Sequence, residues 1–134
     1  MSTMEQTMLG FGAGLSKAGY IPVIHTITPF LVLRALEQIK VDFVYNKLSC
    51  NIVSVGGSND YAKLGTTHHC FEDVNILSSY QDINLFIPSN EKFLRLLSNL
   101  KRLFISEENI NLFTPWFLDH SRRTEVTKTF CLKV

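Results

Sequence analysis

The sequence lacks the features that would place it in several broad classes of protein. Its 134 residues include only three cysteines, Cys50, Cys70 and Cys131, and no two of them form a Cys-x-x-Cys pair. This set does not suggest a disulfide framework, and we expect reduced thiols in a cytoplasmic protein. No apolar run reaches the roughly 18 residues that a transmembrane helix needs. The first residues also lack the basic stretch and apolar core of a signal peptide, so we expect no membrane association.

The chain also lacks a strong charge of either sign. Thirteen Lys and Arg residues and twelve Asp and Glu residues give a formal net charge of +1, so there is no electrostatic reason to expect a nucleic-acid partner. Hydrophobic residues make up 46% of the chain, which is typical of a globular protein rather than a disordered one. The length suits about one domain with its own core. On this reading the chain contains no internal repeat and no low-complexity segment.

The clearest local pattern is a predicted strand that leads into a predicted helix within residues 20–39. Tyr20–Ile27 is apolar and rich in β-branched residues, as in strands that are covered on both faces. Thr28 is a suitable N-cap and Pro29 suits the first helical position. The helix is expected to run to about residue 45. Its apolar positions recur at helical spacing: Val32, Leu36, Ile39 and Phe43.

The remaining elements alternate between strands and helices. Further strands are expected at residues 51–55, 83–87 and 110–118, and helices after residue 72 and from about residue 89 to 100. Pro115 would make the last strand an edge strand or a broken one. Because the chain is weakly patterned from Asp119 onward, we predict a domain of residues 1–118 and a C-terminal tail of residues 119–134. This order predicts an α/β fold with a mostly parallel sheet flanked by helices.

Two glycine-marked stretches are candidate functional segments. A helix is also expected between a cap at Ser2 or Thr3 and an end at Gly19. Gly10, Gly12 and Gly14 in this helix each cost about 1 kcal/mol relative to alanine, so we expect close packing against a neighbouring backbone or a cofactor. A long polar loop at residues 56–69 follows the second predicted strand, and long loops in compact domains are often functional. His68 and His69 in this loop could suggest a metal site. Adjacent side chains diverge, however, and no partner lies at ligand spacing, so we predict no metal.

Four pieces of the sequence form an ordered set: MEQTMLGFGAGLSKAG, IPVIHTITPFLVLRALEQI, the GTTHH loop with the helix after it, and NLFIPSN. Together, in this order, they resemble the pyrimidine-binding domain of transketolase-type thiamine diphosphate enzymes. The resemblance extends over residues 4–100. It implies the thiamine diphosphate-binding fold and the transfer of a ketol or acyl group through the ylid of the cofactor, thiamine diphosphate.

The resemblance implies cofactor contacts for three residues. Glu5 matches the family glutamate that hydrogen-bonds a ring nitrogen of the aminopyrimidine and promotes loss of the thiazolium proton. By position alone, Glu5 would be a charge that favours the helix dipole. Phe30 lies near the aromatic residue that stacks on the pyrimidine, although the bare sequence is also consistent with a core position. Ile27 falls where relatives often place a second aromatic contact.

The resemblance also implies contacts with the substrate. His68 matches the histidine of a Gly-x-Thr-His loop, which faces the substrate as a polar or proton-transferring group. His25 lies near the same site at the end of the predicted strand, where a satisfied buried histidine is the alternative. Leu64 stands where transketolases carry an acid, so the resemblance does not extend to recognition of sugar-phosphate hydroxyls.

Finally, the resemblance implies a partner. In the family the diphosphate and Mg²⁺ are held by a separate domain through a Gly-Asp-Gly motif, which this sequence lacks. A strand and a helix normally precede the glutamate segment, so we expect an N-terminally truncated domain with exposed apolar surface and unpaired backbone groups. One hypothesis is the pyrimidine-binding half of a split enzyme that works with a diphosphate-binding subunit in a homo- or hetero-oligomer. The other is a catalytically inactive truncated relative that acts as an interaction module.

Overall fold

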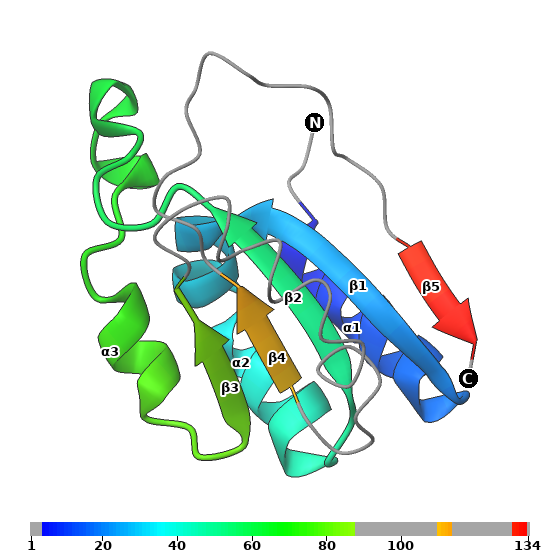
Figure 1. The fold of residues 1–134 in the computed structure, drawn as a ribbon. Coiled ribbons are helices and arrows are strands. Elements are labelled where there is room, and N and C mark those ends of the chain that lie inside the picture. Colours follow the sequence, from blue (N-terminus) through cyan, green and yellow to red (C-terminus); the bar gives the residue numbers. More distant parts are fainter. Residues whose placement is uncertain (1–3, 88–109, 114–129, 134) are drawn as a thin grey trace.

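The chain folds around a five-stranded sheet in a computed structural model that describes residues 4–87, 110–113 and 130–133 (Figure 1). The strands lie in the order β3-β4-β2-β1-β5. Neighbouring strands are parallel except for β5, which is antiparallel to β1. The predicted α/β fold with a mostly parallel sheet is therefore confirmed. The strand bounds are Tyr20–Ile27 (β1), Cys50–Val55 (β2), Ile83–Phe86 (β3), Ile110–Phe113 (β4) and Phe130–Lys133 (β5).

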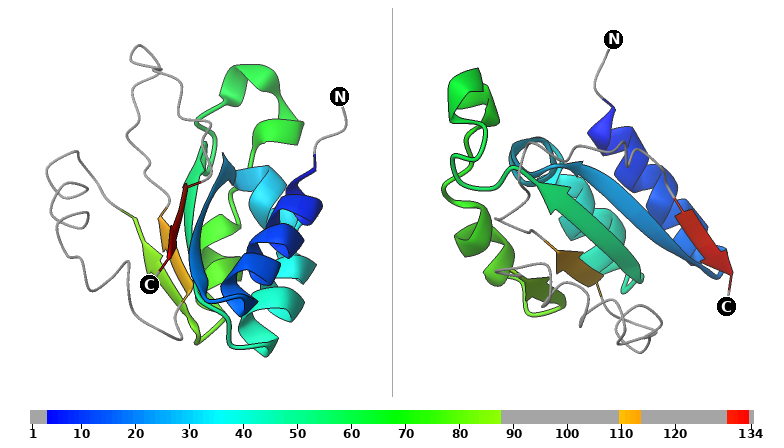
Figure 2. Two further views of the ribbon diagram at one scale, coloured as in Figure 1. Left: turned by 90° about the vertical axis from the view of Figure 1, so that its right-hand side faces the viewer. Right: turned by 45° about the horizontal axis from the view of Figure 1, so that its top comes forward.

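Helices cover one face of this sheet (Figure 2). α1 spans Glu5–Lys17 and packs beside a helical segment of residues 30–45, in which π-helical turns flank a short α-helix. None of the helices in the described ranges is long and apolar enough to cross a bilayer. The further bounds are Phe30–Arg34 (η1, π), Leu36–Gln38 (α2), Ile39–Tyr45 (η2, π), Ala62–Leu64 (η3, 3-10), Thr66–His68 (η4, 3-10) and Asp73–Ser78 (α3).

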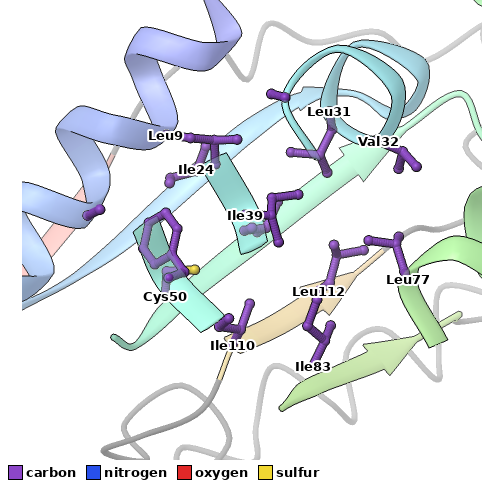
Figure 3. Close-up of a cluster of buried hydrophobic side chains, with 14 of the residues drawn as sticks. Leu9, Ile24, Leu31, Val32, Ile39, Cys50, Leu77, Ile83, Ile110 and Leu112 are labelled. Carbon is purple, nitrogen blue, oxygen red and sulfur yellow. The ribbon is translucent and has the colours of Figure 1, made fainter. Parts of the chain in front are cut away.

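The hydrophobic core lies between the sheet and the helices (Figure 3). Side chains alternate along each strand, and one set points toward the helices. Ile24, Ile52 and Leu112 from three neighbouring strands are at most 1% exposed, and they share one buried cluster with Leu9 and Phe43. Burying a side chain of this size contributes roughly 1.5–3 kcal/mol. Because Leu9 lies one turn after the start of α1, this packing also positions the beginning of that helix on the sheet.

The helical segment of residues 30–45 confirms the predicted helix and three of the four residues predicted for its buried face, because Val32, Ile39 and Phe43 are fully buried. The predicted stripe included Leu36, which the structure leaves half-buried. Leu31 and Ala35 are fully buried as well, so a row of buried residues at four-residue spacing runs through Leu31, Ala35, Ile39 and Phe43. η1 and η2 are π-helical, and their i→i+5 hydrogen bonds place more residues in each turn than the 3.6 of an α-helix. A four-residue repeat therefore stays on one side of the segment.

Thr28 does not act as the predicted N-cap. Its Oγ1 lies 3.0 Å from the carbonyl oxygen of Val55 and 3.1 Å from Oγ of Ser54. No side-chain hydrogen bond caps the helical segment after Pro29. Because Thr28 is fully buried, its hydroxyl needs a partner inside the protein. The bond therefore ties the turn after β1 to the carboxyl end of β2.

The C-terminal strands differ from the prediction in two respects. β4 ends at Phe113, before Pro115, and lies between β3 and β2. Of the two predicted alternatives, the edge strand was wrong, whereas a strand that stops before Pro115 agrees with the broken one. A proline beyond the end of a strand removes none of its hydrogen bonds. Residues 130–133, expected to be part of an unpatterned tail, form β5 and cover residues 20–23 of the sheet edge at β1. The predicted helix at residues 89–100 lies outside the described residues.

The expectation of no internal repeat was wrong for one short segment. β3 and β4 both read Ile-Asn-Leu-Phe, and they pair in parallel with identical residues opposite one another. Asn84 Nδ2 donates to Asn111 Oδ1, and Asn111 Nδ2 donates to Asn51 Oδ1, each at 3.1 Å. Asn51 and Asn111 are at most 2% exposed. The ladder stabilises this register, because a shifted strand would leave buried amides unpaired.

Candidate functional site

Glu5, the first residue of α1, provides the carboxylate of the site. Its side chain is 10% exposed, and Arg34 Nη1 donates a hydrogen bond to its Oε2 at 2.8 Å. In the described part of the chain, Glu5 Oε1 accepts no hydrogen bond. A carboxylate can accept at both oxygens. Glu5 therefore presents one oxygen that is held and one that is open, at the N-terminal end of α1 where negative charge is favoured.

Phe30 provides the aromatic surface of the site. It is the first residue of η1 and follows the turn at the carboxyl end of β1. The Arg34 guanidinium lies over its ring, with Cζ 4.3 Å from the ring centroid. Side chains four residues apart on a helix are neighbours, and a cation–π contact of this kind contributes about 0.5–1 kcal/mol at an exposed site. Arg34 therefore connects the Glu5 carboxylate to the Phe30 ring.

The loop after β2 brings further aromatic side chains to the same edge of the sheet. Parallel strands present their carboxyl ends at one edge, where open α/β sheets bind ligands. The loop is closed at its base by backbone hydrogen bonds between Ser58 and Cys70, of 3.0 and 2.8 Å. Between them lie the two short turns η3 and η4. The loop is thus a compact unit above the carboxyl end of β2.

His68, in η4, lies against Phe30. The two ring centroids are 5.2 Å apart and the ring planes cross at 67°, an edge-to-face arrangement that aromatic pairs favour. Nδ1 of His68 lies 3.0 Å from Oγ1 of Thr67, and its Nε2 makes no hydrogen bond with the residues that the structure describes. The predicted site residues Glu5, Phe30 and His68 are therefore brought together, with Arg34 between the first two.

Tyr61 belongs to the same cluster and was not identified from the sequence. Its ring lies 6.1 Å from that of His68, at 78°. Gly56 has a φ of +73°, and a Cβ at this position would collide with the Tyr61 ring. In the sequence, only a glycine after β2 and an aromatic residue in the following loop could have indicated this contact. Neither residue predicts that the loop folds back on Gly56. Arg34 was likewise not identified from the sequence as a residue of the site.

His25 and Ile27 lie on β1 and make no hydrogen bond or ring contact with this cluster in the described ranges. Nδ1 of His25 lies 2.7 Å from the carbonyl oxygen of Val53. A carbonyl oxygen can only accept, so this nitrogen carries the hydrogen. Ile27 is half-buried at the end of β1, opposite Val55. The predicted substrate contact of His25 and cofactor contact of Ile27 stay predictions.

His69 points into different surroundings from His68. Its Nε2 lies 3.4 Å from the carbonyl oxygen of Ala62, and its ring packs against Phe71 with centroids 5.7 Å apart. Among residues 4–87, 110–113 and 130–133, no group of three or more His, Cys, Asp and Glu side chains is arranged to hold a metal ion. That His68 and His69 bind no metal stays a prediction.

Two buried ionisable groups lie at the base of the loop. Burial, with smaller contributions from the Asp73 and Glu72 carboxylates, raises the pKa of the Cys70 thiol to about 12. Burial also raises the pKa of Asp73, whose Oδ1 accepts the N–H of Val74 at 2.7 Å. Oδ2 of Asp73 has no hydrogen-bond partner among the described residues. A thiol that stays protonated is not a nucleophile, so Cys70 contributes to the packing of the loop base.

The three glycines of α1 have different surroundings. A Cβ at Gly12 would lie 2.6 Å from Cδ1 of Ile24, so this glycine allows the close approach of α1 to β1. A Cβ at Gly14 would meet nothing within 4 Å, and one at Gly10 would meet only Asp42 Oδ2 at 3.7 Å, as far as the structure is described. The expected close packing is therefore found at Gly12 alone, and the other two glycines leave the outer surface of α1 open.

Comparison with known proteins shows what this arrangement resembles. Residues 2–101 match the family described as the transketolase pyrimidine-binding domain. An apulose-4-phosphate transketolase subunit of Actinobacillus succinogenes is 35% identical over 86 residues, which are 64% of this chain and 28% of that protein. The protein of the same name from Phocaeicola vulgatus is 34% identical over 96 residues, 72% of this chain and 31% of its own length. The chain thus spans less than a third of these curated relatives.

Solved structures contain the same fold. A split gene transketolase, in the form of an inactive beta4 tetramer, is 25% identical with a TM-score of 0.69, over 86% of this chain and 36% of that chain. Transketolase from Campylobacter jejuni has a TM-score of 0.70 over 82% of this chain and 17% of its own, with 14% identity, and therefore supports the fold alone. These matches confirm the fold and the resemblance drawn from the four sequence pieces.

Proposed function

The chain belongs to the family of transketolase pyrimidine-binding domains, and we propose that it supplies the pyrimidine-binding half of a transketolase-type enzyme that transfers a ketol or acyl group. The observation that carries this proposal is the cluster of Glu5, Arg34, Phe30 and His68. Its members come from the start of α1 and from the segments that follow β1 and β2. This is the edge at which open α/β sheets bind ligands.

The described residues suit an aminopyrimidine ring. Glu5 Oε1 is an open acceptor for a ring nitrogen, and Phe30 offers a flat apolar surface on which a ring can stack. Aromatic stacking contributes about 0.5–1.5 kcal/mol beyond the burial of surface. Family membership implies dependence on thiamine diphosphate, which when bound supplies a carbon nucleophile for carbonyl substrates. Glu5 would hold and move a proton at the ring nitrogen.

The loop after β2 is assigned to the substrate. His68 Nε2 has no partner among the described residues and is available to a substrate oxygen. Its ring orientation is supported by the edge-to-face contacts with Phe30 and Tyr61. We assign His25 and Ile27 to the outer part of the site, as substrate and cofactor contacts respectively, on the basis of the family pattern alone.

A partner, which is a separate subunit or another domain of the same enzyme, would hold the diphosphate and Mg²⁺, because these 134 residues contain no Gly-Asp-Gly motif. We place its docking surface on the outer side of α1, where Met4 is 58% exposed and Phe11 is 66% exposed. Gly10 and Gly14 leave space there for another backbone to approach. Exposed apolar side chains of this size often mark interfaces. In support, two relatives are named as transketolase subunits, and one structural neighbour is a split gene transketolase.

The proposal can be tested by retrieving that partner. Tagged chain would be used to capture proteins from extracts of its source cells, and the complex would be assayed for ketol transfer with thiamine diphosphate and Mg²⁺. We expect Glu5→Gln to lower the rate about 10²–10⁴-fold without affecting capture, because a positioned acid–base group contributes that much. Glu37→Gln, at an exposed position of α2, is the matched control and should leave the rate unchanged.

The outcomes separate the two hypotheses. Full activity of Glu5→Gln would contradict the proposed role of the site. A captured partner without any transferase activity in the wild-type complex would support the alternative of an inactive interaction module. Phe11→Glu tests the surface itself, because a charge in an apolar interface should abolish capture while leaving the fold unchanged.

A further inference from the structure

We propose that Arg34 is the positioning residue of this half-site, which orients both groups that would contact the pyrimidine. This inference rests on the proposed function and adds to it the residue that sets the geometry. The guanidinium holds one oxygen of Glu5 at 2.8 Å and lies 4.3 Å from the centre of the Phe30 ring. One side chain therefore links a hydrogen-bond acceptor from α1 to an aromatic surface from η1.

The ion pair decides which oxygen of Glu5 is presented. Nη1 of Arg34 occupies Oε2, whereas Oε1 has no partner among the described residues. A glutamate at the first position of a helix can otherwise adopt several rotamers. Fixing one oxygen limits this freedom before a ligand arrives, and such preorganisation lowers the entropic cost of binding.

The cation–π contact orients the ring of Phe30. The guanidinium covers one face of the ring, and the His68 ring meets Phe30 at 67°. Contacts with two different side chains therefore fix the orientation of the Phe30 ring. Arginine suits this double contact better than lysine, because its guanidinium is planar, can stack on an aromatic ring and can still donate within its own plane.

The exposure of Arg34 indicates that its role is to position the site rather than to stabilise the fold. The Arg34 side chain is 38% exposed, and ion pairs that water can reach contribute little to folding stability. A residue that acts mainly through stability would change the unfolding midpoint and ligand affinity together. We expect Arg34 substitutions to change affinity much more than stability.

The test is an NMR titration of the full chain with thiamine, which contains the pyrimidine but no diphosphate. In the wild type, thiamine should shift the signals of Glu5, Phe30 and His68. Arg34→Met should raise the Kd for thiamine about tenfold, as expected when a hydrogen bond to a charged group is lost. Arg34→Lys should recover only part of this loss. Lys40→Met, at an exposed position of the same helical segment, is the matched control and should bind as the wild type does.

A double-mutant cycle shows whether Arg34 acts through Glu5. In a Glu5→Gln background, Arg34→Met should weaken thiamine binding by much less than tenfold, because the group that it orients is already altered. Equal affinity of wild type and Arg34→Met would overturn the inference while leaving the proposed function intact. An equal loss in both backgrounds would also overturn it, as would large unfolding of both Arg34→Met and Arg34→Lys.

The failure of the proposed function has a different signature. If thiamine shifts no signal of Glu5, Phe30 or His68 in the wild-type chain, the pyrimidine site itself is wrong. Arg34 would then have no pyrimidine-binding groups to position, so this result would contradict both proposals.

Discussion

Asp73 is the residue whose protonation should govern the pH dependence of stability. It is 1% exposed at the start of α3, and burial raises the pKa of its carboxyl group above the ordinary value of 3.8. The folded protein then holds this proton more tightly than the unfolded chain does. The contribution of Asp73 to the free energy of unfolding is therefore most favourable below the unfolded pKa and is lost as the pH rises through the folded pKa.

Asp73→Asn removes this titration and keeps an oxygen that can accept the Val74 N–H. We expect the unfolding free energy of the wild type to decline, relative to the variant, as the pH is raised from about 3.5 toward 7, because this range starts below the ordinary pKa of an aspartate. Urea unfolding monitored by circular dichroism at several pH values would measure the difference. Parallel curves for the two proteins would show that Asp73 is not the group responsible.

Single-residue predictions from the sequence succeeded where local chemistry was sufficient. Glu5, Phe30 and His68 were named from motif pieces and are brought together in the structure. Thr28 was misjudged, because its hydroxyl bonds to Val55, 27 positions away. Tyr61 was missed because its contact with His68 depends on how the loop closes. Interactions of this kind depend on the fold and leave no local pattern.

At the scale of elements, α1 contains a natural comparison between two glycines. A Cβ at Gly12 would lie 2.6 Å from Ile24, which is 1% exposed, whereas a Cβ at Gly14 would meet nothing within 4 Å. We expect Gly12→Ala to lower the free energy of unfolding by about 1–3 kcal/mol through overpacking. Gly14→Ala should raise the free energy of unfolding by up to about 1 kcal/mol, because alanine favours helix more than glycine does.

Thermal unfolding of the two variants beside the wild type would measure both effects. The Gly14→Ala protein also serves in partner capture, where an added methyl group should weaken docking if another backbone approaches α1 closely. Stabilisation by both substitutions would show that Ile24 can move away without cost. Destabilisation by both would show that α1 depends on glycine for another reason.

Elements with a strong local pattern were predicted well. β1 was predicted with its observed bounds, and β2 begins one residue earlier than predicted. For the buried face of residues 30–45, Val32, Ile39 and Phe43 were predicted correctly. Leu36 was not, because π-helical turns shift the repeat from 3.6 residues toward four. β5 was missed, since a four-residue strand without a clear alternation depends on the edge of β1 for its existence.

For the molecule as a whole, β5 provides a test of how the sheet edge is protected. β5 pairs with residues 20–23 of β1, so the last described strand in the sequence lies against the first. A chain truncated before Phe130 should therefore show faster hydrogen exchange at those backbone N–H groups of residues 20–23 that point toward β5. Amides of β2, which is paired on both sides, are the internal control. Unchanged exchange in β1 would show that β5 adds no protection.

The repeated Ile-Asn-Leu-Phe segment also affects the chain once it is unfolded. Identical short segments that stack in parallel and in register, with ladders of asparagine amides, are the building units of amyloid fibrils. The native sheet already contains two such segments in that arrangement, and Asn84 ends the ladder at an exposed position. In the folded chain the stack stops at β3, the last strand in that direction among those described.

Heat-unfolded chain should therefore form fibrils with a strand spacing of about 4.7–4.8 Å in X-ray diffraction. Asn84→Lys would place like charges above one another along the stack, so it should lengthen the lag phase of thioflavin T fluorescence. Ser79→Lys, at an exposed position outside the repeat, should not. An unchanged lag for Asn84→Lys would show that aggregation begins elsewhere. A longer lag for Asn84→Lys would show that the asparagine amides that set the register of the native strands also set the register of the fibril.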